Sequence, residues 1–306
     1  MISFRHHAVS IAAVFLALAV GVVLGTRVHG DGLFPGSGNS SQIDDLKAEN
    51  GRLNDQVKAA DAFLAGSAGK LLAGTLANRS VLVFTTPDTD PGDADAVTTA
   101  LTTAGANVTG RVGLTGAFVD SSEGDRLRSA LTNVVPAGAQ LKIDAVDQGS
   151  MAGDLLGQVL LTDPANGQPR GTEQERSLAV ETLRGGGFLT ADTVAPAQLA
   201  VVVTGDGAKA DQNNRGTIIA RFAGALRSHG AGVVLAGRYG AAVGPGPIAV
   251  ARSEAPLATV TTVDNVDREI GRVTTVLGLS EQLNGGTGRY GTADKATSLT
   301  VAAMPH

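Results

Sequence analysis

The residues best suited to chemistry lie in one acidic loop, directly after an apolar run at residues 81–84. Its four carboxylates stand close together in the sequence: Asp88, Asp90, Asp93 and Asp95. Oxygen ligands of this kind suit a hard cation such as Ca²⁺. The same pattern is also typical of a helix start, with Asp93 as the cap and the other carboxylates interacting with the helix dipole and with water. We favour the helix start and keep the four aspartates as the candidate metal ligands.

Motifs for nucleotide binding and catalysis are missing from the sequence. There is no G-x-x-x-x-G-K-[ST], and no G-x-G-x-x-G follows the first apolar run. The glycine-rich residues 285–291 follow an expected helix, so we interpret them as a helix end and a tight turn. Past residue 30 the histidines are His229 and His306, and we expect His229 to cap a helix. No Ser/His/Asp or H-E-x-x-H set can be assembled, so we predict no enzyme, no catalytic residue and no bound cofactor.

Composition narrows the functional classes further. The chain has 306 residues and a net charge of −5 without a basic tract, which argues against nucleic-acid binding. It has no Cys, so disulfides and thiolate metal sites are excluded. About 43% of the residues are apolar but only 3% are aromatic. A sizeable core must therefore be built from Val, Leu, Ile and Ala.

The pattern of apolar residues predicts strands and helices in alternation from residue 79 onward. Strands are expected at 81–84, 108–112, 199–203, 233–235, 248–250 and 258–263. Helices are expected at 93–104, 121–134, 151–161, 172–184, 216–227 and from 269 or 272 to 283. Such alternation is typical of βαβ units, so we predict a doubly wound, mainly parallel α/β domain over residues 79–306. A boundary near residues 185–198 would divide it into two halves.

In a sheet of this class, ligands bind beyond the carboxyl ends of the strands. The acidic loop falls there. So do the loops after Val203 and Leu235, and together with the loop after Phe84 they would form a solute-binding site if the domain binds a solute.

A helix with a heptad pattern precedes the domain, after a Gly/Ser-rich spacer at residues 30–42. Its a and d positions are Ile43, Leu46, Asn50, Leu53 and Val57, followed by Ala60 and Leu64. A single Asn at an a position favours a defined parallel register. We predict a coiled-coil stalk over residues 43–78 that joins two copies of the chain. The alternative is a lone amphipathic helix that packs on its own domain.

The N-terminal residues 1–29 contain one apolar segment, residues 8–25, without a charge. At about 1.5 Å per residue it reaches roughly 27 Å, close to a hydrocarbon core of about 30 Å. We predict an uncleaved transmembrane helix with the N-terminus inside and residues 30–306 outside the cytoplasm; a cleaved signal peptide is the alternative. Small residues at every fourth position favour close packing against a second helix: Ala13, Ala17, Gly21 and Gly25.

Short stretches along almost the whole chain carry a family resemblance. They are residues 1–3 with Arg5, 7–10, 12–19, 146–150, 152–157, 201–205, 220–223, 235–238, 262–264, 284–286 and 290–292. In order and spacing they resemble the MctB-like mycobacterial copper transport family. The resemblance implies an envelope protein of copper homeostasis, described for the family as a pore-forming outer-membrane component that lowers intracellular copper. Copper is then a transported ion rather than a cofactor.

The chain offers few of the ligands that copper prefers. Copper(I) favours Cys and Met, and copper(II) favours His. The methionines are Met1, Met151 and Met304, and relatives can carry histidines where this chain has Thr287 and Arg289. Two hypotheses follow: a membrane-anchored copper transport component, or a stalked, dimeric interaction module of the envelope that transports nothing itself.

Overall fold

The computed structural model describes residues 37–136, 147–207 and 210–302. The chain divides into two units, Met1–Ala60 and Asp61–His306. No helix within the described ranges has the length and apolar character to cross a bilayer. The expected membrane segment, residues 8–25, lies outside these ranges together with its packing residues Ala13, Ala17, Gly21 and Gly25.

The expected stalk region forms one long helix, α2 (Ser37–Leu72). It begins inside the expected Gly/Ser spacer and ends before residue 78, because Gly74 adopts a φ of +75° and Asn78 a φ of +60°. Both values lie in the left-handed region that ends helices. Residues 73–78 are therefore a turn rather than part of the stalk.

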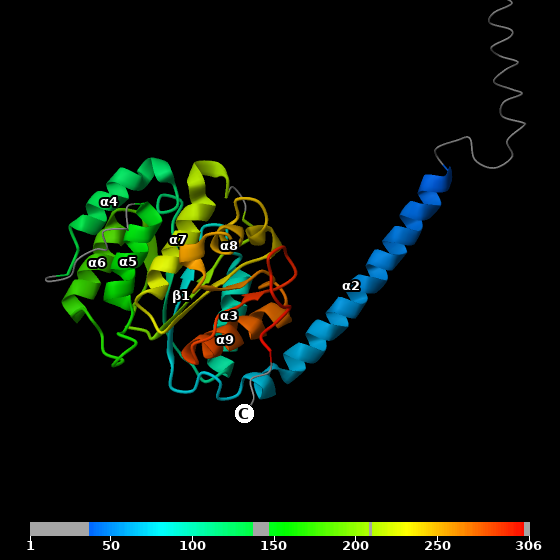
Figure 1. Ribbon diagram of the computed structural model, residues 1–306, viewed down its shortest axis with the longest axis horizontal. Coiled ribbons are helices and arrows are strands. Elements are labelled where there is room, and N and C mark those ends of the chain that lie inside the picture. Colours follow the sequence, from blue (N-terminus) through cyan, green and yellow to red (C-terminus); the bar gives the residue numbers. More distant parts are fainter. Residues whose placement is uncertain (1–36, 137–146, 208–209, 303–306) are drawn as a thin grey trace, which may run out of the picture. The chain divides into compact units, whose positions relative to one another are not determined.

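The second unit is built on one seven-stranded sheet (Figure 1). Its strands are β1 (Ser80–Thr85), β2 (Asn107–Leu114), β3 (Leu189–Ala191), β4 (Leu199–Val203), β5 (Gly232–Ala236), β6 (Thr261–Val263) and β7 (Arg289–Tyr290). The spatial order is β3-β2-β1-β4-β5-β6-β7, and only the β2–β3 pair is antiparallel. Because β1 pairs with β4, the segments on both sides of residues 185–198 belong to the same sheet.

Helices cover both faces of this sheet. They are α3 (Pro91–Thr103), α4 (Gly124–Thr132), α5 (Gln148–Leu160), α6 (Glu173–Gly185), α7 (Arg215–Arg227), α8 (Pro247–Ala251) and α9 (Glu269–Leu283). The described residues also contain four short 3-10 turns: η1 (Ser121–Glu123), η2 (Gln212–Asn214), η3 (Tyr239–Ala242) and η4 (Ala255–Leu257). This arrangement confirms the predicted α/β class with a mainly parallel sheet.

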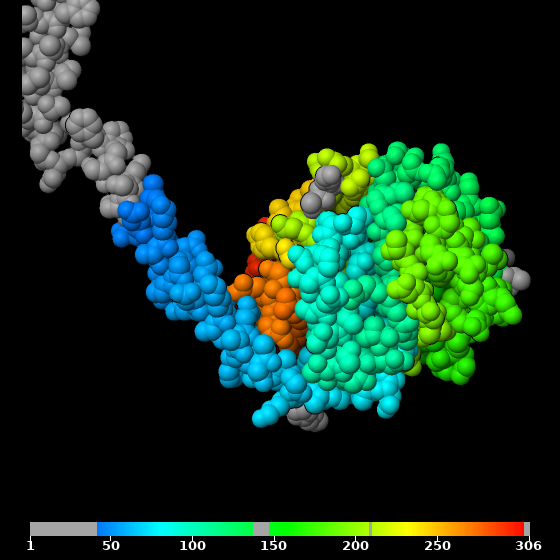
Figure 2. All heavy atoms as spheres, turned by 180° about the vertical axis from the view of Figure 1, so that it is seen from behind, coloured from blue at the N-terminus to red at the C-terminus, as the bar shows by residue number. Residues whose placement is uncertain are grey.

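Alternate residues of the central strands enter two separate cores. In β1, Leu82 and Phe84 pack against α4–α8, whereas Val81 and Val83 pack against α3, α9 and the end of α2. The helices α3 and α9 cover the face of the sheet to which Val81 and Val83 point. In Figure 2, α3 (cyan) and α9 (orange) lie side by side. Strands buried on both faces read as continuous apolar runs, which explains why the prediction placed β4 at residues 199–203 with its observed bounds.

Three glycines let α5 and α7 approach closely, and Figure 1 shows the two helices adjacent. A Cβ at Gly149 or Gly153 would overlap the backbone oxygens of Ile218 or Phe222 on α7. A Cβ at Gly157 would lie 2.7 Å from the ring of His229. Glycines four residues apart line one helical face, so any side chain there would push α7 outward.

Some expected elements are wrong. Residues 248–250 form part of helix α8, not a strand, because Pro247 at its first position starts a helix and so short an apolar run does not distinguish the two. The strand expected at 258–263 is limited to Thr261–Val263. The expected turn at 285–291 contains the short strand β7, which adds to the sheet beside β6.

Candidate functional site at the carboxyl edge of the sheet

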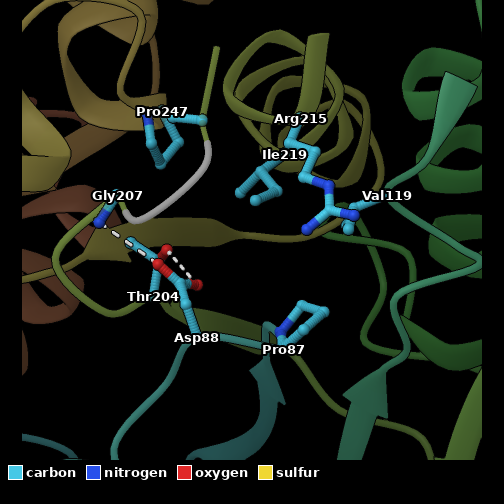
Figure 3. A pocket seen from close by; sticks show the side chains of 9 residues that line it. Pro87, Asp88, Val119, Thr204, Gly207, Arg215, Ile219 and Pro247 are labelled. Atoms are coloured by element: carbon cyan, nitrogen blue, oxygen red, sulfur yellow. Dashed lines mark hydrogen bonds between the residues drawn. The ribbon is translucent and has the colours of Figure 1, made fainter. Parts of the chain in front are cut away.

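The strand order reverses between β1 and β4, and sheets of this class bind ligands in the crevice beyond that point. Asp88 joins the two loops that form this crevice (Figure 3). Its Oδ1 accepts hydrogen bonds from the hydroxyls of Thr86 at 2.6 Å and Thr204 at 3.3 Å. Its Oδ2 accepts one from the backbone N–H of Gly207 at 3.1 Å. A Cβ at Gly205 would overlap the backbone oxygen of Asp88, so this approach requires glycine.

The space left in the crevice is about 20 Å³, which is room for about one water. Figure 3 shows Arg215 reaching toward it from the start of α7, opposite Pro87 and Asp88. The Nη2 atom of Arg215 lies 3.5 Å from Oδ2 of Asp120, and its Nε is buried without a hydrogen-bond partner in the described part of the chain. The loops after Phe84 and Val203 thus meet as expected, but their described residues leave no space for an organic solute.

Asp90, not Asp93, caps the helix that follows the acidic loop. Its Oδ1 accepts a hydrogen bond from the backbone N–H of Gly92 at 2.8 Å, and Pro91 takes the first helical position. The expected cap at Asp93 is wrong because proline favours the first helical position, so α3 starts at Pro91, two residues earlier than expected, and Asp90 becomes the cap. Asp90 also lies 3.0 Å from Nη2 of Arg238.

Asp93 is buried inside the first turn and holds two arginines. Its Oδ2 accepts from Nε of Arg238 at 2.7 Å, and its Oδ1 lies 3.7 Å from Nη2 of Arg272. The hydrogen bond that Arg238 donates to Asp93 raises the pKa of the Arg238 guanidinium. Asp95 instead pairs with Arg111 at 2.8 Å. Asp90 and Asp93 thus share Arg238, whereas Asp88 and Asp95 have other partners. Within the described residues no three metal-ligating side chains come together.

His229 does not cap α7; it forms a buried pair with Asp154 of α5. Its Nε2 lies 2.6 Å from Oδ1 of Asp154, whose side chain is 1% exposed. The cap position belongs to Ser228. The prediction failed because the ring of His229 instead packs against Gly157 of α5 and meets Asp154 on the same helix.

A buried ion pair, which the sequence did not reveal, joins β6 to the C-terminal segment. The guanidinium of Arg252 donates to Oδ2 of Asp264 at 2.8 Å, to the hydroxyl of Thr262 at 3.0 Å and to the backbone oxygen of Tyr290 at 2.8 Å. Asp264 in turn accepts from the backbone N–H of Thr292 at 2.8 Å. Both charged side chains are fully buried, so this buried clip fixes the glycine-rich tail to the sheet.

The heptad residues of α2 remain on its surface. Exposed fractions are 48% for Ile43, 69% for Leu46, 47% for Leu53 and 42% for Val57. Asn50 is also exposed and accepts a hydrogen bond from Asn54 at 3.1 Å. These residues form the apolar stripe that a coiled coil requires, and the described residues leave it uncovered.

Comparison with known proteins assigns the family. Residues 1–301 match the family model described as "Copper transport outer membrane protein, MctB". A protein of Mycobacterium tuberculosis named copper transporter MctB is 42% identical over 313 residues, 99% of this chain and 100% of its own. Its namesake from Mycobacterium leprae is 45% identical over 315 residues, 98% of this chain and 99% of its own. The chain therefore belongs to the MctB family of copper transport proteins.

Proposed function

We propose that this protein takes part in copper transport at the cell envelope, with copper as its cargo. The observation that carries the proposal is the family match from residue 1 to residue 301, together with relatives that are 42–45% identical over nearly their full length. Cargo rather than cofactor is supported by the composition, since the chain has no Cys and only three Met. Soft thiolate and thioether ligands are what a tight copper(I) site needs.

The proposed topology is a single N-terminal span at residues 8–25, with the following residues outside the cytoplasm. Support comes from the charge-free apolar run and from Arg5 on its N-terminal side. The family description adds the outer membrane as the location. Mass spectrometry of membrane fractions tests the anchor: retention of residues 8–25 in the mature protein supports it, and a mature N-terminus beyond residue 25 overturns it.

Cellular copper content is the direct test of function. A strain that lacks this protein should accumulate copper several-fold over its parent when grown in copper, and should stop growing at lower copper. The full-length chain should restore both values. A chain without residues 8–25 is the matched control and should restore neither, because the α/β unit would lose its proposed anchor. Unchanged copper content in the deletion strain would overturn the proposal.

Pore formation is a finer proposal, and it rests only on the family resemblance given in the sequence analysis. The purified full-length protein should then give discrete conductance steps in planar bilayers. Steps that persist in the presence of copper support a pore. A protein that inserts and never conducts favours a transport role through partner proteins.

A second candidate function is a dimeric interaction module, and the uncovered heptad residues of α2 favour it. Ile43, Leu46, Leu53 and Val57 fall at a and d positions and are each more than 40% exposed. Burying such a stripe against a second copy removes apolar area from water, which stabilises association. Asn50 at an a position would hold two parallel helices in one register. The proposed partner of α2 is therefore α2 of a second chain.

Single-cysteine variants give a clean test because the natural chain has no Cys. Asn50→Cys should form a disulfide-linked dimer in membranes under mild oxidation. Asp55→Cys is the matched control; it lies at an f position on the same helix, 80% exposed, and should crosslink weakly. Equal crosslinking of both variants indicates random collision, and no crosslinking of Asn50→Cys excludes the coiled coil.

A further inference from the structure

A groove runs along the outer side of α7, between α5 and η4, away from the acidic loop. Its volume is about 480 Å³, within the range of pockets that hold small organic ligands. Its floor is apolar, formed by Gly224 and Ala225 of α7 with Pro256 and Leu257 of η4. Near the carboxyl end of α7 the groove is lined by a cation, Arg227.

Arg227 is half-buried, and no carboxylate of the described residues pairs with it. Its Nη1 donates to the backbone oxygen of Gly230 at 3.1 Å. Its Nε is buried and bonds to no atom of the described residues. Burial lowers the pKa of its guanidinium, with no carboxylate to oppose this effect.

The other charged side chains that line the groove are already engaged. Asp154 lies 2.6 Å from the ring of His229. Arg221 lies 3.2 Å from a carboxylate oxygen of Glu254. Within the described part of the groove, the uncompensated charge is therefore the positive charge of Arg227.

A half-buried charge without a partner costs free energy that proteins avoid by pairing it. Arg252 in this chain follows that rule, since its fully buried guanidinium has Asp264 and three further acceptors. Arg227 is an exception to this pairing rule, and it lines a groove that is open to small molecules. An anion in the groove would supply the missing partner, and the planar guanidinium fits a carboxylate with two parallel hydrogen bonds.

We propose that this groove binds a small organic carboxylate, with its carboxylate group on Arg227 and its apolar body over Gly224, Ala225 and Leu257. One cation beside an apolar floor suits a monoanion with a hydrocarbon part better than a multiply charged inorganic anion. The site is independent of the proposed copper function.

Hexanoate is the probe, and equilibrium dialysis of the full-length protein measures its binding. Hexanoate should bind saturably with one molecule per chain. Arg227→Met should weaken binding at least tenfold, and Arg227→Lys should weaken it less, because the charge remains but the fork is lost. Arg268→Met is the matched control; it removes an arginine that is paired with Asp61 at 3.0 Å and should leave binding unchanged.

Two competitors separate the sources of binding. 1-Hexanol has the same apolar body without the charge, and inorganic phosphate has charge without the body. Neither should displace hexanoate at equal concentration. Displacement by phosphate would make this an inorganic-anion site, and equal binding of hexanoate to wild type and Arg227→Met would make it an apolar groove only. Either result overturns the proposal. The absence of saturable hexanoate binding to the folded wild-type protein would overturn it as well.

Discussion

The clip around Arg252 and the groove beside Arg227 each contain a buried arginine, but the two guanidinium groups have opposite surroundings. In the clip, Asp264, the hydroxyl of Thr262 and two backbone oxygens accept hydrogen bonds from the guanidinium, and the side chains of Arg252 and Asp264 are fully buried. In the groove, the described residues give the guanidinium of Arg227 one backbone partner and no carboxylate. Since a buried ion pair is costly to break but an unpaired charge is costly to keep, the first region serves the stability of the fold. The second region is the place where we propose that an anion from solution pairs with the guanidinium.

The largest effect is expected when the clip is broken on one side. Arg252→Met should destabilise the full-length protein by about 3–5 kcal/mol, because it leaves the Asp264 carboxylate buried and unpaired. Urea unfolding followed by circular dichroism measures the change. The double variant Arg252→Met/Asp264→Leu should recover much of the loss, since no unpaired charge then remains.

A partly exposed pair is the control for this variant. Arg268→Met removes the partner of Asp61, and their side chains are 36% and 28% exposed, so the variant should cost less than about 1 kcal/mol. If Arg252→Met cost no more than Arg268→Met, the clip would not be the structural element described above.

Alanine substitutions at one glycine in the clip and one in the groove should give the next largest difference in stability. Gly291 in the clip has a φ of +129°, and a Cβ there would overlap the carboxylate of Asp264. Gly224 in the groove is helical, and its Cβ would meet only the flexible end of Leu257. We expect Gly291→Ala to cost about 3 kcal/mol from strain and overpacking. Gly224→Ala should cost about 1 kcal/mol or less, because the gain in helix propensity offsets the contact. Equal urea midpoints of the two variants would contradict this ranking.

The sequence predicted the fold where apolar runs are continuous. Leu199–Val203 is buried on both faces and was placed with its observed bounds. Short elements escaped prediction: the antiparallel edge strand Leu189–Ala191 has three residues, and Pro247–Ala251 has an apolar run that fits a strand as well as a helix. Where tertiary contacts decide the conformation, local pattern carries too little information.

The candidate site was predicted in place but not in detail. The acidic loop does lie at the carboxyl end of β1, because strand direction alone fixes that position. The ion pairs depend on the tertiary structure, which brings Arg238 to Asp93 and Arg252 to Asp264. No periodicity in the sequence records such pairs.

Small residues at every fourth position indicate close contact between two helices, but they do not indicate whether the helices lie in a membrane or inside an α/β domain. Gly149, Gly153 and Gly157 repeat at every fourth position, and in α5 they bring α7 close within the α/β unit. The same spacing in the N-terminal residues 13–25 therefore predicts a close helix partner, while the membrane assignment rests on the apolar run alone.

Alkaline pH should weaken the clip region through Tyr290. Burial raises the pKa of its phenol, and the hydrogen bond it donates to Glu281 at 2.7 Å acts in the same direction. The folded state therefore holds the proton more tightly than the unfolded chain, whose tyrosines ionise near about 10. The stabilisation is fully present below that pH and is lost as pH rises above it, by at most about 1.4 kcal/mol per pH unit. Tyr290→Phe should abolish this part of the slope in urea unfolding measured from pH 9 to 11, and an identical slope in both proteins would remove Tyr290 as its source.

The smallest effect is expected in the groove. Arg227→Met should change the free energy of unfolding by less than about 1 kcal/mol, or raise it, because no carboxylate is left unpaired when the cation is removed. Urea unfolding should thus give nearly the wild-type midpoint without hexanoate, whereas hexanoate should raise the midpoint of wild type alone, since a ligand that binds only the folded state stabilises it. A loss near that of Arg252→Met would mean that Arg227 has a stabilising partner after all, and the contrast between the two arginines would then disappear together with the reason to expect an anion in the groove.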